Sequence, residues 1–139
     1  MKLTAKTRYA VRILSELAAA AVPLSIGDLS ERTGISPRAV ENICARLRYD
    51  GISTGIVGPG GGIRLDVPLE AISLGRLVDL FENGVEFAVC CGDKANDCPH
   101  RSLCENRIVW RELSAKIQAQ LDAIPLDALL RHYGPARIT

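Results

Sequence analysis

The fold is decided by residues 34–65, which read GISPRAVENICARLRYDGISTGIVGPGGGIRL. Ser36-Pro37 predicts a helix start, because the Ser hydroxyl can cap free amides and Pro suits the first helical position. The helix that follows carries its apolar side chains at spacings of three and four and is expected to end near Gly51. Those apolar positions are Val40, Ile43, Cys44 and Leu47.

A glycine-rich hairpin follows this helix. Two β-like stretches, 52–57 and 63–67, flank Gly58-Pro59-Gly60-Gly61-Gly62. Such a run cannot be helical, and its glycines permit the positive-φ geometry of a hairpin tip. Pro68 closes the unit, so the sequence predicts a helix followed by a two-stranded β-wing.

Working outward towards the N-terminus, the pattern adds two helices. Residues 5–21 are Ala-rich, with apolar positions at Ala10, Ile13, Leu14, Leu17, Ala18 and Ala21. Pro23 ends this helix, Ser25 can cap a short second helix to about Thr33, and Gly34 supplies the turn. The predicted order is that of a winged helix-turn-helix: two helices, a Gly-containing turn after the second, a third helix and a hairpin.

Beyond the hairpin we expect a fourth helix over 73–83, ended by Gly84, and a last short helix over 126–133. Between them, a long helix is predicted from about Ser102 to Ile124. Phe81 and Trp110 are expected in the core. The apolar residues of the long helix follow the spacing of a helix–helix seam, at Ile108, Val109, Leu113, Ile117, Leu121 and Ile124.

The charge is distributed unevenly along a chain of 139 residues and net charge +1. Residues 1–64 hold nine basic and five acidic side chains, whereas residues 65–139 hold eight basic and eleven acidic ones. A basic N-terminal half suits a surface that faces phosphates, although chance scatter would give a similar bias. No signal peptide or membrane-spanning run stands out, which predicts a cytoplasmic chain without membrane partners.

The winged helix-turn-helix order and the charge bias predict binding to double-stranded DNA. The start of the third helix would enter a major groove, and the bare hairpin tip would let backbone approach the duplex closely. Helix-turn-helix geometry also occurs in modules that bind no DNA. No Gly-Lys-Ser/Thr follows the glycines, so the run does not predict a P-loop, and no catalytic arrangement predicts an enzyme. The predicted DNA contacts are Ser36, Arg38, Asn42, Arg46, Arg48, Gly60, Gly61 and Arg64.

Four of the five cysteines lie in a segment without periodicity, residues 88–104. In the cytosol such thiols are more often ligands or reactive groups than structural disulfides. Their chemistry suits an iron–sulfur cluster, a thiol–disulfide switch or zinc, although the paired Cys-x-x-Cys of common zinc sites is absent. The fifth, Cys44, is interpreted as a small buried hydrophobic residue. The four in the segment are Cys90, Cys91, Cys98 and Cys104.

Several motifs resemble those of the bacterial Rrf2 family of regulators, and the resemblance runs from Leu3 to about Tyr133. The Gly-Pro-Gly-Gly-Gly wing is the most specific of them. The others are Thr7–Leu17, Gly34-Ile35-Ser36, Ala45-Arg46-Leu47-Arg48, Ile63-Arg64-Leu65, Ile72-Ser73-Leu74 and Trp110-Arg111-Glu112-Leu113-Ser114. The resemblance implies a mainly α winged-helix fold with a long helix that crosses between the subunits of a homodimer.

The resemblance also implies an iron–sulfur cluster, 2Fe-2S or 4Fe-4S, on Cys91, Cys98 and Cys104. Cys90 is an alternative first ligand or the fourth one, because the gap from Cys91 to Cys98 is a residue longer than is usual in the family. Family members place a His or an Asp at positions that match Arg107 and Arg8 here, and an Arg cannot ligate. His100, Asp93, Asp97 or an exogenous ligand are the remaining candidates for the fourth position.

Two departures from the family pattern lie in the DNA-binding part. Val57 stands where members often carry an Arg before the wing glycines, and Ala39 stands where an aromatic residue is common. Both changes predict an altered operator sequence or weaker contact with the minor groove.

The sequence therefore predicts a DNA-binding regulator, a repressor, whose operator binding is controlled by an iron–sulfur cluster. The alternative is a cluster-free regulator that responds through thiol–disulfide exchange. A small redox enzyme and a protein-docking module are weaker hypotheses. The expected parts are a DNA-binding domain over 1–83, a cysteine-rich loop over 84–104, and a dimerisation helix with a short final helix over 105–139.

Overall fold

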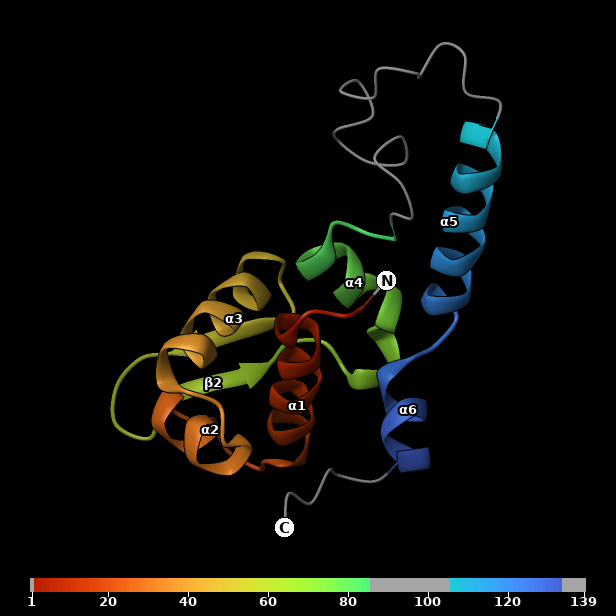
Figure 1. Cartoon of the computed structure of the whole chain (residues 1–139). Helices are drawn as coiled ribbons and strands as arrows, with labels where there is room; N and C mark the ends of the chain where they lie inside the picture. The colour runs from red at the N-terminus through yellow and green to blue at the C-terminus, as the bar shows by residue number, and fades with distance from the viewer. Residues whose placement is uncertain (1, 86–105, 134–139) are drawn as a thin grey trace.

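The computed structural model describes residues 2–85 and 106–133. This part is mainly helical, with one two-stranded antiparallel sheet, so the predicted fold class is confirmed. In chain order the elements are α1 (Ala5–Ala19), α2 (Ile26–Thr33), α3 (Pro37–Tyr49), β1 (Ser53–Ile56), β2 (Gly62–Leu65), the 3-10 turn η1 (Leu69–Ala71), α4 (Leu74–Glu82), α5 (Asn106–Asp122) and α6 (Leu126–Tyr133) (Figure 1).

Local capping fixes the helix-turn-helix formed by α2 and α3. Ser25 and Asp28 form a reciprocal capping box at the start of α2, and Gly34 ends α2 in the left-handed conformation, with φ 72°. Ser36 caps α3 by accepting a hydrogen bond from the Ala39 amide at 3.3 Å, and Pro37 opens the helix. The starts and the turn are those that the sequence predicts.

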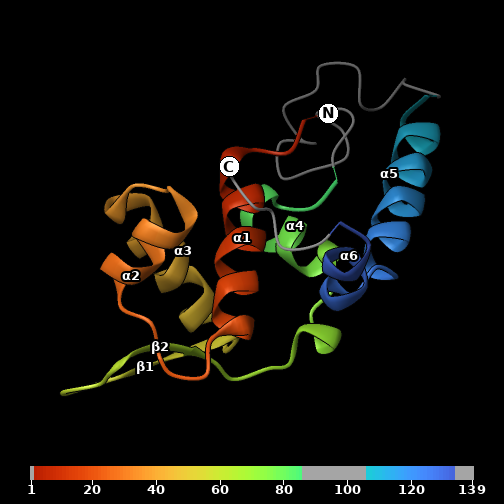
Figure 2. The ribbon, with the colours of Figure 1, turned by 90° about the horizontal axis from the view of Figure 1, so that it is seen from below.

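The wing is a hairpin in which Ser53 pairs with Leu65 and Ile56 with Gly62. Strand β2 is tied to the segment before α2, because Leu24 and Ile63 exchange backbone hydrogen bonds of 2.9 and 2.7 Å. Figure 2 shows the two strands extending away from the helices as a narrow ribbon. Strand β2 is therefore fixed to the body of the domain at Ile63, and the glycine-rich tip projects beyond the Ile56–Gly62 pair.

The core lies between α1, α2, α3, the base of the wing and the start of α4. Ala18 and Ala21, expected on the apolar face of the first helix, are exposed: Ala18 lies in the last turn of α1, and Ala21 lies beyond the end of the helix at Ala19. The fully buried side chains include Ile13, Leu14, Leu29, Val40, Leu47, Ile52, Ile72, Leu77, Val78 and Leu126.

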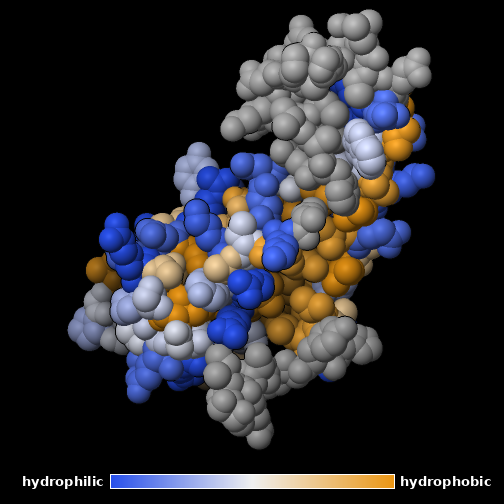
Figure 3. Space-filling view, viewed as in Figure 1, coloured by the Kyte–Doolittle hydropathy of each residue, from blue (hydrophilic) through white to orange (hydrophobic). Residues whose placement is uncertain are grey.

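The C-terminal half of helix α5 packs on the start of α4, and the rest of α5 extends away from the remaining helices (Figures 1 and 2). Four large apolar side chains in its first half are exposed, and Figure 3 shows a hydrophobic surface along this helix. Trp110 is 40 % exposed, so its predicted place in the core is wrong: no neighbouring element of the described chain covers that half of α5. Phe81 is half-buried against the core. The four exposed apolar side chains in the first half of α5 are Ile108, Val109, Trp110 and Leu113.

The predicted start of the long helix, residues 102–105, lies outside the described residues, and α5 ends at Asp122, two residues before the predicted end. In the part of the chain that the structure describes, no helix combines the length and the apolar character that a membrane crossing requires.

Candidate nucleic-acid interface

The outer face of α3 is open to solvent and polar. Its inner face is buried through Val40, Ile43, Cys44 and Leu47, which turns Arg38 and Asn42 outward one turn apart. Ser36 is exposed at the N-terminus of the helix, where free amides give the end a positive potential. The structure therefore presents Ser36, Arg38 and Asn42 together at the end of α3 that a major groove accepts.

The two arginines further along α3 are placed differently. The Arg46 Nε lies 3.2 Å from a carboxylate oxygen of Asp50, and its guanidinium lies 5.7 Å from the centre of the Tyr49 ring. The Arg48 side chain extends towards the wing. If Gly55 on β1 carried a Cβ, the Arg48 Nη1 would lie 3.8 Å from it. Arg46 is thus partly neutralised within the helix, and a phosphate would compete with Asp50 for it. The i,i+4 spacing of Arg46 and Asp50 in the sequence is the signal that could have shown this pair.

The wing tip requires its glycines for two separate reasons. Gly58 and Gly60 have φ of 98° and 75°, which L side chains rarely adopt. A Cβ at Gly61 would lie 2.7 Å from the Gly58 carbonyl oxygen, so the backbone leaves no room for a side chain at this position. Val57 is 99 % exposed beside the tip, and Arg64 is exposed on β2. The tip thus offers backbone and the apolar side chains of Val57 and Pro59, with Arg64 as the nearby charge.

Helix α4 holds both α1 and α3. At its first turn, the Arg76 Nη2 donates a 3.1 Å hydrogen bond to the carbonyl oxygen of Asp50, at the end of α3. At its last turn, Glu82 Oε1 accepts from the Thr4 amide and hydroxyl at 2.7 Å and from the Thr7 hydroxyl at 2.6 Å. These contacts could not be predicted from the sequence, because partners separated by 26 to 78 residues leave no local pattern.

The hydrogen bonds on Glu82 change its acidity. Burial alone would raise the pKa of Glu82, but the hydrogen bonds from Thr7 and Thr4, together with the nearby charge of Lys6, hold the pKa below its ordinary value. The carboxylate therefore stays ionised while it anchors the start of α1.

Of the five cysteines, the structure describes Cys44, whose predicted burial is confirmed at 5 % exposure. Burial raises the pKa of the Cys44 thiol to about 11, although Arg48 acts in the opposite direction. Cys90, Cys91, Cys98, Cys104 and His100 lie outside the described residues. Among residues 2–85 and 106–133, no three His, Cys, Asp or Glu side chains gather as a metal site would need.

The chain is similar in sequence to known transcriptional regulators. Residues 3–132 match the profile of the Rrf2 family, described as an iron-dependent transcriptional regulator. The chain belongs to the Rrf2 family of transcriptional regulators. It is 36 % identical over 132 residues to the HTH-type transcriptional regulator IscR of Aliivibrio salmonicida, covering 94 % of this chain and 77 % of that one. The identity to the IscR of Vibrio cholerae is also 36 %, over 94 % of this chain and 75 % of that one.

Solved structures share the fold of this Rrf2 protein. The T. potens IscR superposes with a TM-score of 0.73 at 24 % identity, covering 100 % of this chain and 93 % of that one. CymR, the global cysteine regulator of B. subtilis, gives 0.71 at 23 % identity, covering 95 % and 98 %. The winged helix predicted from the sequence is thus confirmed as a family fold.

Proposed function

We propose that this Rrf2 protein is a homodimeric repressor that binds double-stranded DNA through α3 and the wing, in the cytoplasm, under the control of an iron–sulfur cluster. The observation that carries the proposal is the exposed polar end of α3, where Ser36, Arg38 and Asn42 stand clear of the core. Arg48, Gly60, Gly61 and Arg64 would add contacts on the wing side, and Arg46 would do so once released from Asp50. Arg side chains suit guanine and Asn suits adenine in the major groove.

The apolar side chains of α5 support the dimer. Ile108 and Val109 are 66 % and 55 % exposed on the long helix, and large apolar groups at helical spacing favour burial against a second helix. Two copies would then present two α3 helices to a pseudo-palindromic operator. The division into a DNA-binding part over 1–83, a cysteine loop over 84–104 and a dimerisation part over 105–139 belongs to this proposal.

The donor chemistry of the chain fits an iron–sulfur cluster. Four thiols lie between the end of α4 and the start of α5, whereas Cys44 is excluded as a ligand by its burial in the core. Cys91, Cys98 and Cys104 would hold the cluster, with Cys90 or His100 as candidates for the remaining position. When bound, the cluster would supply a centre that reacts with oxygen, nitric oxide or changes in redox poise.

Helix α4 would carry a change in the cysteine segment to the DNA-binding surface, because it directly precedes that segment in the chain. Arg76 holds the end of α3 and Glu82 holds the start of α1, so a shift of α4 alters the support of both helices. A differential affinity of a few kcal/mol between two arrangements of the dimer is enough for regulation.

The test is the visible absorbance of anaerobically purified protein, with iron and sulfide assays, in wild type, Cys98→Ala and Cys44→Ala. We expect absorbance bands, iron and sulfide in wild type and in Cys44→Ala, and their loss in Cys98→Ala. A colourless wild type that binds no iron after reconstitution would reject the cluster. If that protein still binds DNA and its affinity changes with oxidant, the cluster-free thiol–disulfide regulator is the correct function.

A further inference from the structure

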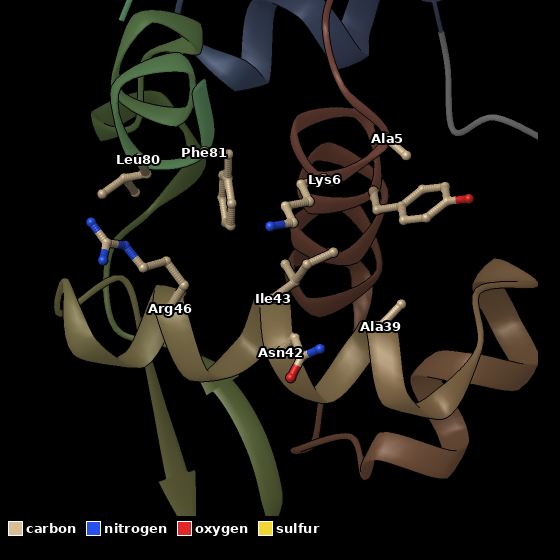
Figure 4. A pocket seen from close by; sticks show the side chains of 9 residues that line it. Ala5, Lys6, Ala39, Asn42, Ile43, Arg46, Leu80 and Phe81 are labelled. Atoms are coloured by element: carbon tan, nitrogen blue, oxygen red, sulfur yellow. The ribbon is translucent and has the colours of Figure 1, made fainter. Parts of the chain in front are cut away.

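A cavity of about 360 Å³ lies where α1, α3 and α4 meet, and Figure 4 shows the side chains that surround it. Its volume falls in the range of sites that hold small molecules. Helix α1 contributes Ala5, Lys6 and Tyr9, helix α3 contributes Ala39, Asn42, Ile43 and Arg46, and helix α4 contributes Leu80 and Phe81.

The inner wall of this cavity is apolar. Ile43 is 3 % exposed, and Leu80 and Phe81 pack against the core from α4. Ala39 ends at its Cβ, so the first turn of α3 leaves open a space that a larger side chain would fill. The combination of an aromatic ring and aliphatic groups suits a flat apolar body.

The polar groups around the cavity are cationic or neutral. Lys6 and Arg46 line it together with the amide of Asn42, and no carboxylate is among the lining residues. Arg46 is shared with Asp50, whereas Lys6 forms no ion pair within 4.0 Å in the described part of the chain. The nearby Glu82 carboxylate is already held by Thr4 and Thr7. Glu82 acts on the charge of Lys6 from outside the cavity, and within the lining itself a ligand would have to supply the negative charge.

We propose that this cavity binds a small aromatic monocarboxylate. The ring lies between Phe81 and Ile43, and the carboxylate lies at Lys6. Figure 4 shows the Lys6 side chain reaching from α1 towards Phe81, which brings the charge and the apolar wall into one space.

The position of the cavity gives the ligand a regulatory consequence, which rests on the proposed function. Asn42 and Arg46 line the cavity and are also predicted DNA contacts. A bound carboxylate would neutralise cationic groups and shield the amide on this side of α3. The ligand and DNA therefore bind in competition.

The binding test is a calorimetric titration of the full chain, without DNA, with indole-3-acetate and with its neutral analogue indole-3-acetamide. We expect the acid to bind about tenfold more tightly than the amide, because a charge-assisted contact is worth roughly that factor. Lys6→Gln should bring the acid to the affinity of the amide, whereas Lys116→Gln, which removes a positive charge on α5, should leave it unchanged. Ala39→Phe should abolish binding of both.

Three results would overturn the proposal: no heat of binding at millimolar acid, equal affinity for acid and amide, or undiminished binding in both Lys6→Gln and Ala39→Phe. The titration needs no DNA, so its outcome stands even if the chain fails to bind an operator. A second titration, of the protein on its selected operator, tests the competition: the acid should lower the apparent DNA affinity of wild type and have no effect on Ala39→Phe. Equal DNA affinity with and without bound acid would overturn the competition.

Discussion

Gly75→Ala is predicted to destabilise the protein, although the same change within a helix is usually favourable. Gly75 is the second residue of α4, and α5 crosses it so closely that an added Cβ would lie 2.7 Å from the Asp122 amide nitrogen and also meet the Asp122 carboxylate. Ordinary van der Waals contact would require the two helices to separate by about 0.7–1.3 Å. The Gln118 amide, which donates to the Gly75 carbonyl oxygen and to Asp122, would move with them.

Two opposing terms decide the sign of the effect. Replacing Gly by Ala in a helix stabilises by about 0.5–1 kcal/mol, whereas forcing an extra methyl into a packed contact costs about 1–3 kcal/mol. We therefore expect a net loss of about 0.5–2 kcal/mol in the free energy of unfolding. For a chain of this size the Tm would fall by about 2–6 °C.

Gly27→Ala is the matched control, because Gly27 is also the second residue of a helix after a Ser cap. A Cβ there would lie 3.7 Å from the Ser25 hydroxyl oxygen, which is an ordinary contact. This variant should gain about 0.5 kcal/mol. Urea and thermal unfolding at equal protein concentration measure both changes, since association shifts apparent stability. If Gly75→Ala stabilises as much as Gly27→Ala, the close packing of α5 on α4 is refuted.

Four further predictions follow from the described contacts. Asp50→Asn should release Arg46 and tighten DNA binding by about two- to fivefold in fluorescence anisotropy; unchanged or weaker binding would show that Arg46 does not contact DNA. Glu82→Gln should destabilise by about 1 kcal/mol at neutral pH. Because the folded pKa of Glu82 is lowered, that difference should shrink as the pH falls below 4.5, and a constant difference would contradict it. Leu47→Ala should cost about 3 kcal/mol in urea unfolding, and a loss below about 1 kcal/mol would place Leu47 outside a packed core. Cys44 should alkylate at least about tenfold more slowly in native protein than in urea at pH 8, and equal rates would reject its burial.

Local signals in the sequence predicted the DNA-binding fold closely. A Ser cap, a Pro at the first helical position and a left-handed Gly act within a few residues of one another, so α2, α3 and the turn at Gly34 could be placed from the sequence. The wing glycines carry the same kind of local information, since their conformations exclude other residues.

Features that depend on distant partners could not be predicted in the same way. Trp110 is a large aromatic residue expected in the core, but burial depends on which element covers it, and within the described chain nothing covers the first half of α5. The anchoring of α1 by Glu82 joins residues 75 and 78 positions apart, which no local pattern reveals. The ligand set among the loop cysteines stays a prediction, because those residues lie outside the described part of the chain.

The most direct test of cluster-controlled DNA binding is the dissociation constant for a selected operator, measured before and after removal of iron from the same protein preparation. We expect the two constants to differ by at least about tenfold in wild type and in Cys44→Ala, and to be equal in Cys98→Ala. Equal constants in wild type, in a preparation that contains iron and sulfide, would contradict control by the cluster.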